Sequence, residues 1–412
     1  MQGTRRSLLF VTLLALGLAA RAAHAQDTAS WSVSGFGTVG VTHSNERHAD
    51  YTSNVMKRSG AGVSRSWSAD VDSRLGLQLD THLDKHWSAV LQVVSEQGLD
   101  NSYRPKVEWA NIKYQLTPDL ALRAGRIALP VFLSADYRRV GYAYPWVRPP
   151  VEGYGVVPIT SSDGVDATLR WNLAGVSNTS QVFLGHDDVA LAPGRRVYAR
   201  GIAGISHTSE WGSLSLRTNV IRAEVSSNLG AELFRGLDAF GPAGQALSRR
   251  YEADHKEMRM ASIGLNYDPG AWFLMAEASR TRTDSFMGAT RSAYVSAGWR
   301  RGAWTPYATL ARVRAAVATT DRGLALDGLP PSALPLAAVL NGGLNELLAT
   351  IPQQSTESLG VRWDLFANAA FKLQYDRVTP RRGSRGTLIN PTPGFRSDHP
   401  VHVASVVLDF VY

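Results

Sequence analysis

The chain has 412 residues, a formal net charge of +8 and no cysteine, so a disulfide framework and thiolate chemistry are excluded. Lysine and arginine are scattered rather than gathered in runs, so the positive charge gives no support for nucleic-acid binding. No stretch has 18 consecutive apolar residues, which leaves no candidate for a membrane-spanning helix. Composition does not shift along the chain and no linker divides it, so we expect one large structure.

The first 25 residues have the features of a secretory signal peptide. Arg5 and Arg6 form a basic start, residues 8–20 are an apolar run too short to cross a bilayer, and Ala23-His24-Ala25 is a small-residue exit. These features favour a signal peptide over a buried N-terminal helix. We expect cleavage between Ala25 and Gln26, which would export residues 26–412 from the cytoplasm.

Sixteen segments alternate between a more apolar and a more polar face, as strands do. In the second segment, Leu75 and Leu77 share one face while Arg74 and Gln78 share the other, and the chain ends on an aromatic residue, Tyr412. In chain order the predicted strands are 31–42, 66–83, 87–95, 107–116, 120–127, 164–172, 181–185, 197–207, 213–223, 259–267, 271–281, 291–300, 304–313, 357–365, 369–378 and 401–412.

The connections between these segments alternate in length. The short ones are 84–86, 117–119, 174–176, 210–212, 268–270, 301–302 and 366–368, and the long ones are 43–65, 128–163, 225–258, 314–356 and 379–400. Short turns at one end and long loops at the other are typical of a closed membrane barrel. In a soluble sandwich or propeller there is no reason for every second connection to be short. The sequence therefore predicts an all-β fold, a transmembrane antiparallel up-and-down β-barrel of about 16 strands.

Aromatic side chains flank the short turns. They are Trp87, Trp211, Trp272, Trp304 and Phe366. In a barrel, all five would lie at one membrane interface, where amphipathic rings anchor a protein. Tryptophans scattered through a soluble core would not cluster at turns in this way.

The chain resembles Gram-negative outer-membrane porins of the 16-stranded general porin superfamily over nearly its whole mature length. The resemblance is carried by the aromatic end and by residues 34–41 (SGFGTVGV), 73–77 (SRLGL), 122–126 (LRAGR) and 371–377 (FKLQYDR). It implies an outer-membrane location, a water-filled channel for passive diffusion of small hydrophilic solutes and ions, and a homotrimer in contact with outer-membrane lipid and lipopolysaccharide. It implies no catalytic residue and no cofactor. The chain departs from many porins by ending on Tyr rather than Phe and by lacking a Pro-Glu-Phe-Gly-Gly turn in the third loop.

In the porin family the third loop folds into the lumen and narrows it, and residues 128–163 occupy that position here. The segment is rich in aromatic residues and in prolines, each of which fixes one φ angle. The aromatic residues are Phe132, Tyr137, Tyr142, Tyr144, Trp146 and Tyr154, and the prolines are at 130, 145, 149, 150 and 158. A stiff aromatic loop suits packing against an inner wall; the alternative is an outside loop packed on a neighbouring subunit.

Alternation also predicts which charges line the water-filled interior. If Leu120, Leu122 and Ala124 face lipid, Arg123 faces the lumen, and the same phasing places Arg217 inside. The predicted constriction and pore-lining residues are Arg74, Lys113, Arg123, Arg126, Asp136, Arg138, Arg139, Arg148, Glu152 and Arg170. Opposed acids and bases in a narrow aqueous hole create a transverse field that screens solutes by charge. Solvated lumen charges with no role in selectivity are the alternative.

The predicted function is therefore passive diffusion of small hydrophilic solutes, without a cofactor, a metal or a nucleic-acid partner. One alternative is a porin selective for small anions or carboxylates, and another is a barrel enzyme or an adhesin. No Gly-x-Ser-x-Gly, His-Glu-x-x-His or phosphate-loop motif occurs, so we predict that the chain is not an enzyme. The apolar segment 324–348, with a predicted helix at 335–348, either caps the mouth or packs on a neighbour.

Overall fold

The structure is a computed structural model that describes residues 29–412 except 158 and 193. The predicted signal peptide lies outside the described residues. The wall consists of β1 (Ser30–Ser44), β5 (Arg74–His82), β6 (Trp87–Glu96), β7 (Lys106–Gln115), β8 (Leu120–Ala128), β9 (Ser161–Leu173), β10 (Val176–Ala192), β11 (Arg195–Trp211), β12 (Leu214–Ser227), β13 (Lys256–Tyr267), β14 (Trp272–Thr283), β15 (Ala289–Trp299), β16 (Trp304–Ala315), β17 (Gln354–Phe366), β18 (Ala369–Pro380) and β19 (Val401–Val411).

Shorter elements lie in the connections. The first loop holds β2 (Asp50–Tyr51), β3 (Ala61–Gly62) and β4 (Trp67–Ser68), and the third loop holds η1 (Ala135–Tyr137), η2 (Gly141–Ala143) and α2 (Val151–Tyr154). The remaining helices are α3 (Ala231–Asp238), α4 (Gly241–Tyr251) and α5 (Leu334–Leu348). No helix among the described residues is long and apolar enough to cross a bilayer.

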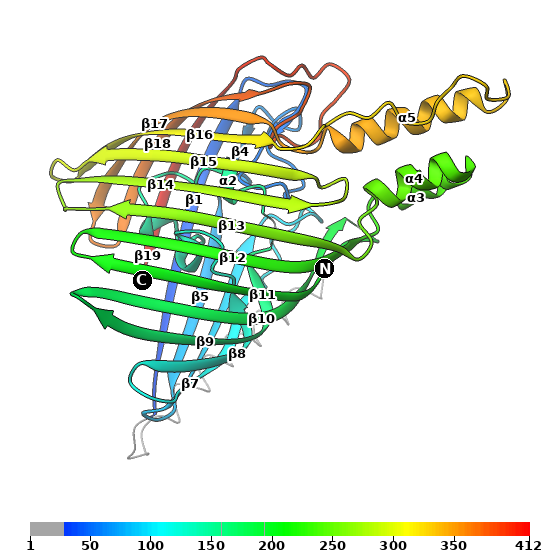
Figure 1. Cartoon of the computed structure of the whole chain (residues 1–412). Coiled ribbons are helices and arrows are strands. Elements are labelled where there is room, and N and C mark those ends of the chain that lie inside the picture. The colour runs from blue at the N-terminus through cyan, green and yellow to red at the C-terminus, as the bar shows by residue number, and fades with distance from the viewer. Residues whose placement is uncertain (1–28, 158, 193) are drawn as a thin grey trace, which may run out of the picture.

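The sheet is antiparallel throughout and closes on itself (Figure 1). One half of β1 pairs with β5, and the other half pairs with β19. At the seam, Gly35 and Tyr412 exchange two backbone hydrogen bonds of 3.0 Å. A Cβ atom on Gly37 would lie 2.3 Å from the ring of Phe410, so the aromatic closing strand requires glycine in the first strand. The predicted 16-strand transmembrane barrel is confirmed.

The outer surface of the wall is apolar and ends in an aromatic band at the short turns. Leu75, Val165 and Leu359 are exposed on it. Near the short turns, Trp211 and Phe366 are 69% and 71% exposed, and Trp87, Trp272 and Trp304 are also exposed. This arrangement matches the outward apolar belt and the interfacial aromatic girdle of membrane barrels.

Two predicted strands differ from the structure by more than a shift of a few residues at their ends. The predicted strand 66–83 is divided into β4 and β5, because Ser68 Oγ accepts a hydrogen bond of 3.2 Å from the Asp70 backbone N–H in a turn between them. The predicted strand 181–185 is the centre of the much longer β10, which forms a hairpin with β11. Alternation is interrupted there by register shifts between Gly185 and Asp187 and between Ala190 and Ala192, which concealed the full length.

Helices α3, α4 and α5 project beyond the rim at the end opposite the short turns (Figure 1). They share a small apolar core that includes Leu237, Leu340 and Leu344. The predicted helix 335–348 therefore corresponds to α5. Its apolar residues are explained in part by packing against α3, and Leu336 and Val339 remain exposed.

Candidate functional site

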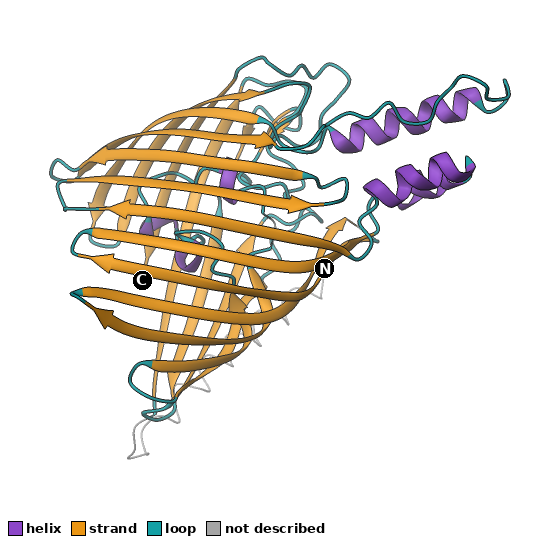
Figure 2. Cartoon of the chain, in the orientation of Figure 1, coloured by secondary structure: helices purple, strands orange, loops and turns teal. Residues whose placement is uncertain are grey.

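The described part of the third loop, residues 129–157 and 159–160, runs inside the barrel and crosses the lumen (Figure 2). The carbonyl oxygen of Val131 accepts a hydrogen bond of 2.8 Å from Ser262 Oγ on β13. Further along, Trp146 Nε1 donates to Ser296 Oγ on β15 at 2.8 Å, and Lys372 Nζ on β18 donates to the Gly141 carbonyl at 2.7 Å. The loop thus contacts inward-facing residues around much of the wall.

Aromatic side chains fill the space between the loop and strands β14 to β16. Trp146 is 1% exposed, and its ring meets Tyr294 edge-on at a centroid distance of 5.8 Å. The rings of Phe132 and Tyr154 are tilted by 34° at a centroid distance of 4.5 Å, and the Tyr154 hydroxyl donates to Glu277 at 2.9 Å. Between the described residues of the loop and this part of the wall, the interior core leaves no aqueous path, because buried rings at native packing density exclude water.

Arg148 anchors the loop through a buried ionic cluster. Its guanidinium lies 2.6 Å from Asp72 and 3.1 Å from Asp376, and it also donates to the hydroxyls of Tyr51 and Ser405. Burial opposes the charge, but the carboxylates hold the pKa of Arg148 well above its ordinary value. Burial would likewise raise the pKa of Asp72, yet the Arg148 cation keeps that pKa below its ordinary value.

Lys372 makes a second anchor from the wall. Its side chain is fully buried, and Nζ lies 2.8 Å from an Asp409 carboxylate oxygen. It donates to three loop carbonyls, those of Gly141, Tyr144 and Trp146, at 2.7 to 2.9 Å. Its three N–H groups thus have acceptors on the loop, while Asp409 of β19 balances its charge.

Three other predicted charged residues of the loop are also in contact with neighbouring protein groups. Arg139 bridges Glu96 at 2.7 Å and Glu108 at 3.2 Å. Glu152 is buried against Thr356 and Gln354, and burial raises its pKa. Arg138 donates to the Tyr154 carbonyl at 2.9 Å, and burial together with the Arg139 cation lowers the pKa of Arg138 to about 10.

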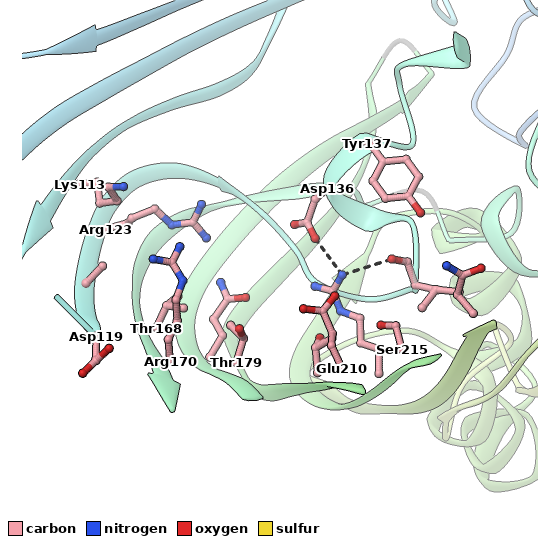
Figure 3. Close-up of a pocket in the computed structure, with 16 residues that line it drawn as sticks. Lys113, Asp119, Arg123, Asp136, Tyr137, Thr168, Arg170, Thr179, Glu210 and Ser215 are labelled. Carbon is pink, nitrogen blue, oxygen red and sulfur yellow. Dashed lines mark hydrogen bonds and ion pairs between the residues drawn. The ribbon is translucent and has the colours of Figure 1, made fainter. Parts of the chain in front are cut away.

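A cavity of about 520 Å³ remains on the other side of the loop, against strands β7 to β13 (Figure 3). Leu133, Asp136 and Tyr137 of the loop bound it, and the wall supplies the rest of its lining. The wall residues are Lys113, Asp119, Ala121, Arg123, Thr168, Arg170, Thr179, Gln181, Thr208, Glu210, Ser215, Arg217 and Asn266. The lining is mostly polar and charged, as a hydrated interior requires.

Three bases gather at one side of this cavity, with Asp119 beside them (Figure 3). Lys113 and Arg123 are cross-strand neighbours, and Arg170 lies nearby on β9. We call these three residues the basic strip. Asp136 and Glu210 lie away from the strip (Figure 3), and Asp136 is paired with Arg217 at 2.8 Å. A solute in the cavity would therefore experience a transverse field.

A family model for Gram-negative porins matches residues 12–385. The chain belongs to the Gram-negative porin family. It is an outer-membrane β-barrel that forms a water-filled channel for passive diffusion of small hydrophilic solutes. The comparison with curated protein sequences found no match to this porin.

Solved structures share the fold of this porin at low identity. The outer-membrane channel DcaP of Acinetobacter baumannii is 10% identical with a TM-score of 0.59, over 94% of this chain and 99% of that one. An anion-selective porin from Comamonas acidovorans is 12% identical with a TM-score of 0.56, over 93% and 100%. OmpT of Vibrio cholerae in a trimer form is 9% identical with a TM-score of 0.51, over 94% and 100%.

The predicted site residues of the porin fall into three groups. Lys113, Arg123, Asp136 and Arg170 line the open cavity. Arg138, Arg139, Arg148 and Glu152 lie in contacts between the loop and its surroundings, and Arg74 lies opposite Glu96 in the β5–β6 register with its Nε atom buried.

Arg126 forms the third group, because it pairs with Asp163 at 2.9 Å and with Asp187 at 3.2 Å outside the lining of the cavity. It follows Gly125, whose φ of +122° interrupts the strand alternation. L residues with a side chain rarely adopt this conformation, so the position favours glycine.

Several cavity residues were not singled out from the sequence. Arg217 was phased to the lumen by alternation, but nothing in the sequence indicated its pairing with Asp136. Thr168, Thr179 and Gln181 carry no charge, so only strand phasing could have found them. These residues line the cavity because the third loop leaves their side of the lumen uncovered. Which side the loop covers is a property of the tertiary structure.

Proposed function

We propose that solutes cross this porin along the wall formed by β7 to β12, between the basic strip and the acidic side of the cavity. The third loop would act as the constriction, because it packs against the opposite wall and leaves space on this side. The observation that carries the proposal is the position of the 520 Å³ cavity, bounded by Leu133, Asp136 and Tyr137 of that loop.

The basic strip favours a preference for anions within this passive channel. Arg123 is paired with Asp166 at 2.9 Å, whereas Lys113 and Arg170 form no ion pair among the described residues. A cation fixed near a narrow aqueous path attracts anions, and salt screens it only partly because the Debye length is about 10 Å at 0.1 M. Small anions and carboxylates are therefore the candidate preferred solutes.

Planar-bilayer recording in a salt gradient tests both the route and the sign of selectivity. We expect the triple variant Lys113→Gln, Arg123→Gln, Arg170→Gln to shift the reversal potential toward cations. A matched variant that removes three exposed charges from α3 and α4, Arg235→Gln, Arg249→Gln, Arg250→Gln, should leave the reversal potential unchanged. Equal shifts in both variants would show that the selective path lies elsewhere.

We further propose that the chain is a channel and not an enzyme. Ser180 Oγ lies 2.9 Å from His207 Nδ1, which is the spacing of a nucleophile and its base. The other ring nitrogen, Nε2, faces the Ser209 hydroxyl at 3.0 Å, and a carboxylate or amide that would orient the ring is lacking from its described contacts. Esterase assays with and without a serine-reactive phosphonate should give equal, background rates; a Ser180-dependent rate would contradict the proposal.

A homotrimer is the proposed assembly, in contact with outer-membrane lipid and lipopolysaccharide. Support comes from the family and from the Vibrio cholerae structure that is named as a trimer form. Light scattering of the detergent-solubilised protein, corrected for bound detergent, should give three times the chain mass. A monomer mass at all concentrations would argue against a trimer.

Residues 1–25 are proposed to be removed on export, which leaves a chain that begins at Gln26. N-terminal sequencing of protein from the outer membrane should read Gln-Asp-Thr-Ala from residue 26. A sequence that begins at Met1 would refute the proposed cleavage.

A further inference from the structure

Seven arginines face outward from the wall at the loop ends of β12 to β16. They alternate with inward-facing residues such as Tyr294, and all seven are exposed. They are Arg222, Arg259, Arg280, Arg282, Arg291, Arg312 and Arg314. We call this set the arginine surface.

Strand register places these like charges directly side by side. Arg291 on β15 lies opposite Arg280 on β14 and opposite Arg314 on β16. Similarly, Arg259 lies opposite both Arg222 and Arg282. Like charges in directly opposed positions destabilise a sheet, so an arrangement of this kind requires compensation.

The protein supplies only part of that compensation. Glu257 lies 2.6 Å from Arg259, and Asp284 lies 3.2 Å from Arg282. The third carboxylate on this face, Glu224, pairs with His255 instead. The other five members, namely Arg222, Arg280, Arg291, Arg312 and Arg314, form no ion pair with any residue that the structure describes.

The arginine surface lies at the level expected for lipid headgroups. On β15, Arg291 and the interfacial Trp299 are eight residues apart, which is roughly 27 Å along the strand. At a strand tilt of about 40° this distance projects to roughly 21 Å along the membrane normal, comparable to the height of the outward apolar band, about 25 Å. Trp299 is exposed at the short-turn end, so Arg291 and its neighbours lie at the opposite boundary of the bilayer.

An apolar groove of about 650 Å³ lies directly below four of these arginines. Its floor contains Ala261, Ala278 and Ala293 on neighbouring strands, and Ala278 is the direct partner of Ala293. The bulkier side chains of Val220 and Ile263 border these small ones. The arginines that reach the groove are Arg280, Arg291, Arg312 and Arg314.

We propose that the arginine surface and this groove together bind a phosphorylated lipid of the outer leaflet. Its phosphate oxygens would accept charge-assisted hydrogen bonds from Arg280, Arg291 and Arg314, which relieves the repulsion among them. An acyl chain would lie in the alanine-floored groove below. A lipid with two or more phosphates fits best, because the guanidinium groups of Arg280, Arg291 and Arg314 are spread over three strands.

The arginine surface and the apolar groove together favour a lipid over an acidic protein as the ligand. The charges end where a continuous apolar surface begins, and this surface includes Ala278, Ala293 and Leu310, all exposed. A soluble acidic partner would match the arginines but would leave the groove unfilled. An amphipathic lipid satisfies the guanidinium groups and the groove at once.

The test uses full-length barrel, refolded without lipid in a maltoside detergent, and native mass spectrometry with bisphosphorylated lipid A as the probe. The triple variant Arg280→Gln, Arg291→Gln, Arg314→Gln should bind lipid A on the order of 100-fold more weakly, since each arginine near an anionic headgroup contributes about 1 kcal/mol. The control variant Arg235→Gln, Arg249→Gln, Arg250→Gln should bind as the wild type does. Heat-modifiable gel mobility verifies that each variant is folded.

A second variant isolates the groove. Ala278→Phe should weaken lipid A binding by roughly tenfold, because it fills the groove without changing charge. Competition by inorganic phosphate should be much weaker than competition by lipid A at equal phosphate concentration. Equal competition, equal binding by the triple variant and its control, or no binding by the wild type would overturn the proposal. So would a lipid-free oligomer that dissociates in the triple variant, since the arginine surface would then face another copy of the chain.

Discussion

The two sides of the lumen use charged residues in opposite ways. Against β14 to β19, the third loop packs on the wall, and Arg148 and Lys372 are buried there in direct contact with carboxylates. Against β7 to β12, Lys113 and Arg170 line a cavity without ion pairs among the described residues. In the proposed route, charge on the sealed side would hold the constriction in place, and charge on the open side would face the passing solute.

Arg148→Met should have the largest effect on stability, because it leaves Asp72 and Asp376 buried without their cation. Breaking a buried ionic cluster in this way costs about 5 kcal/mol, the upper end of the range for such pairs. Urea unfolding of the micelle-embedded barrel, followed by tryptophan fluorescence, measures the change. A loss below about 1 kcal/mol would mean that the loop is not anchored at this point.

Lys372→Met should destabilise the barrel by about 3 kcal/mol, since Asp409 loses its buried partner and three loop carbonyls lose a donor. We also expect noisier single-channel currents as the loop gains freedom. Asp409→Asn made together with Lys372→Met removes the unpaired carboxylate and should recover part of the lost stability. No recovery in the double variant would contradict a buried pair.

Arg138→Met should change the free energy of unfolding by less than about 1 kcal/mol. Arg138 forms no ion pair among the described residues, and the nearby Arg139 cation repels it. Replacing a poorly compensated cation with an apolar side chain of similar length is often neutral. The same urea titration measures it, and a loss as large as that of Arg148→Met would show that the sealed side extends further than we place it.

Thr179→Asp should have the smallest effect on stability, within about 0.5 kcal/mol, because the side chain faces the open cavity. Its new carboxylate lies across from Arg170 in the β9–β10 register, so the reversal potential should move toward cations. Thr320→Asp in the exposed loop after β16 adds the same charge at a distance and serves as the control. Identical reversal potentials for the two variants would remove the open side from the conduction path.

Most of the fold could be predicted from the sequence, because each wall strand satisfies a local rule. A period-2 pattern and turn length identify strands such as β5 and β18 without knowledge of their neighbours. The composition of the third loop led us to expect packing against an inner wall, and Trp146 of the loop contacts Ser296 on β15. The division of β4 from β5 and the extent of β10 were missed, since they depend on local turns and register shifts that interrupt alternation.

The distinction between the two sides of the lumen could not be predicted from sequence. Alternation assigns a residue to the inner face, but it does not indicate whether the third loop then covers that residue. Arg148 meets Asp72 from the first loop and Asp376 from β18, which are 76 and 228 residues away in the chain. Pairings this distant depend on the closed barrel, so Arg148 and Arg123 looked equivalent in the sequence.

Cysteine accessibility tests the separation of the two sides most directly, because the chain has no cysteine of its own. Thr179→Cys places a thiol in the open cavity, and Ser358→Cys places one on the sealed side, where Ser358 is 8% exposed. During bilayer recording, a charged methanethiosulfonate reagent should reduce the current through Thr179→Cys within minutes and leave the current through Ser358→Cys unchanged. Equal modification of both thiols, or block of Ser358→Cys alone, would contradict a solute path along β7 to β12.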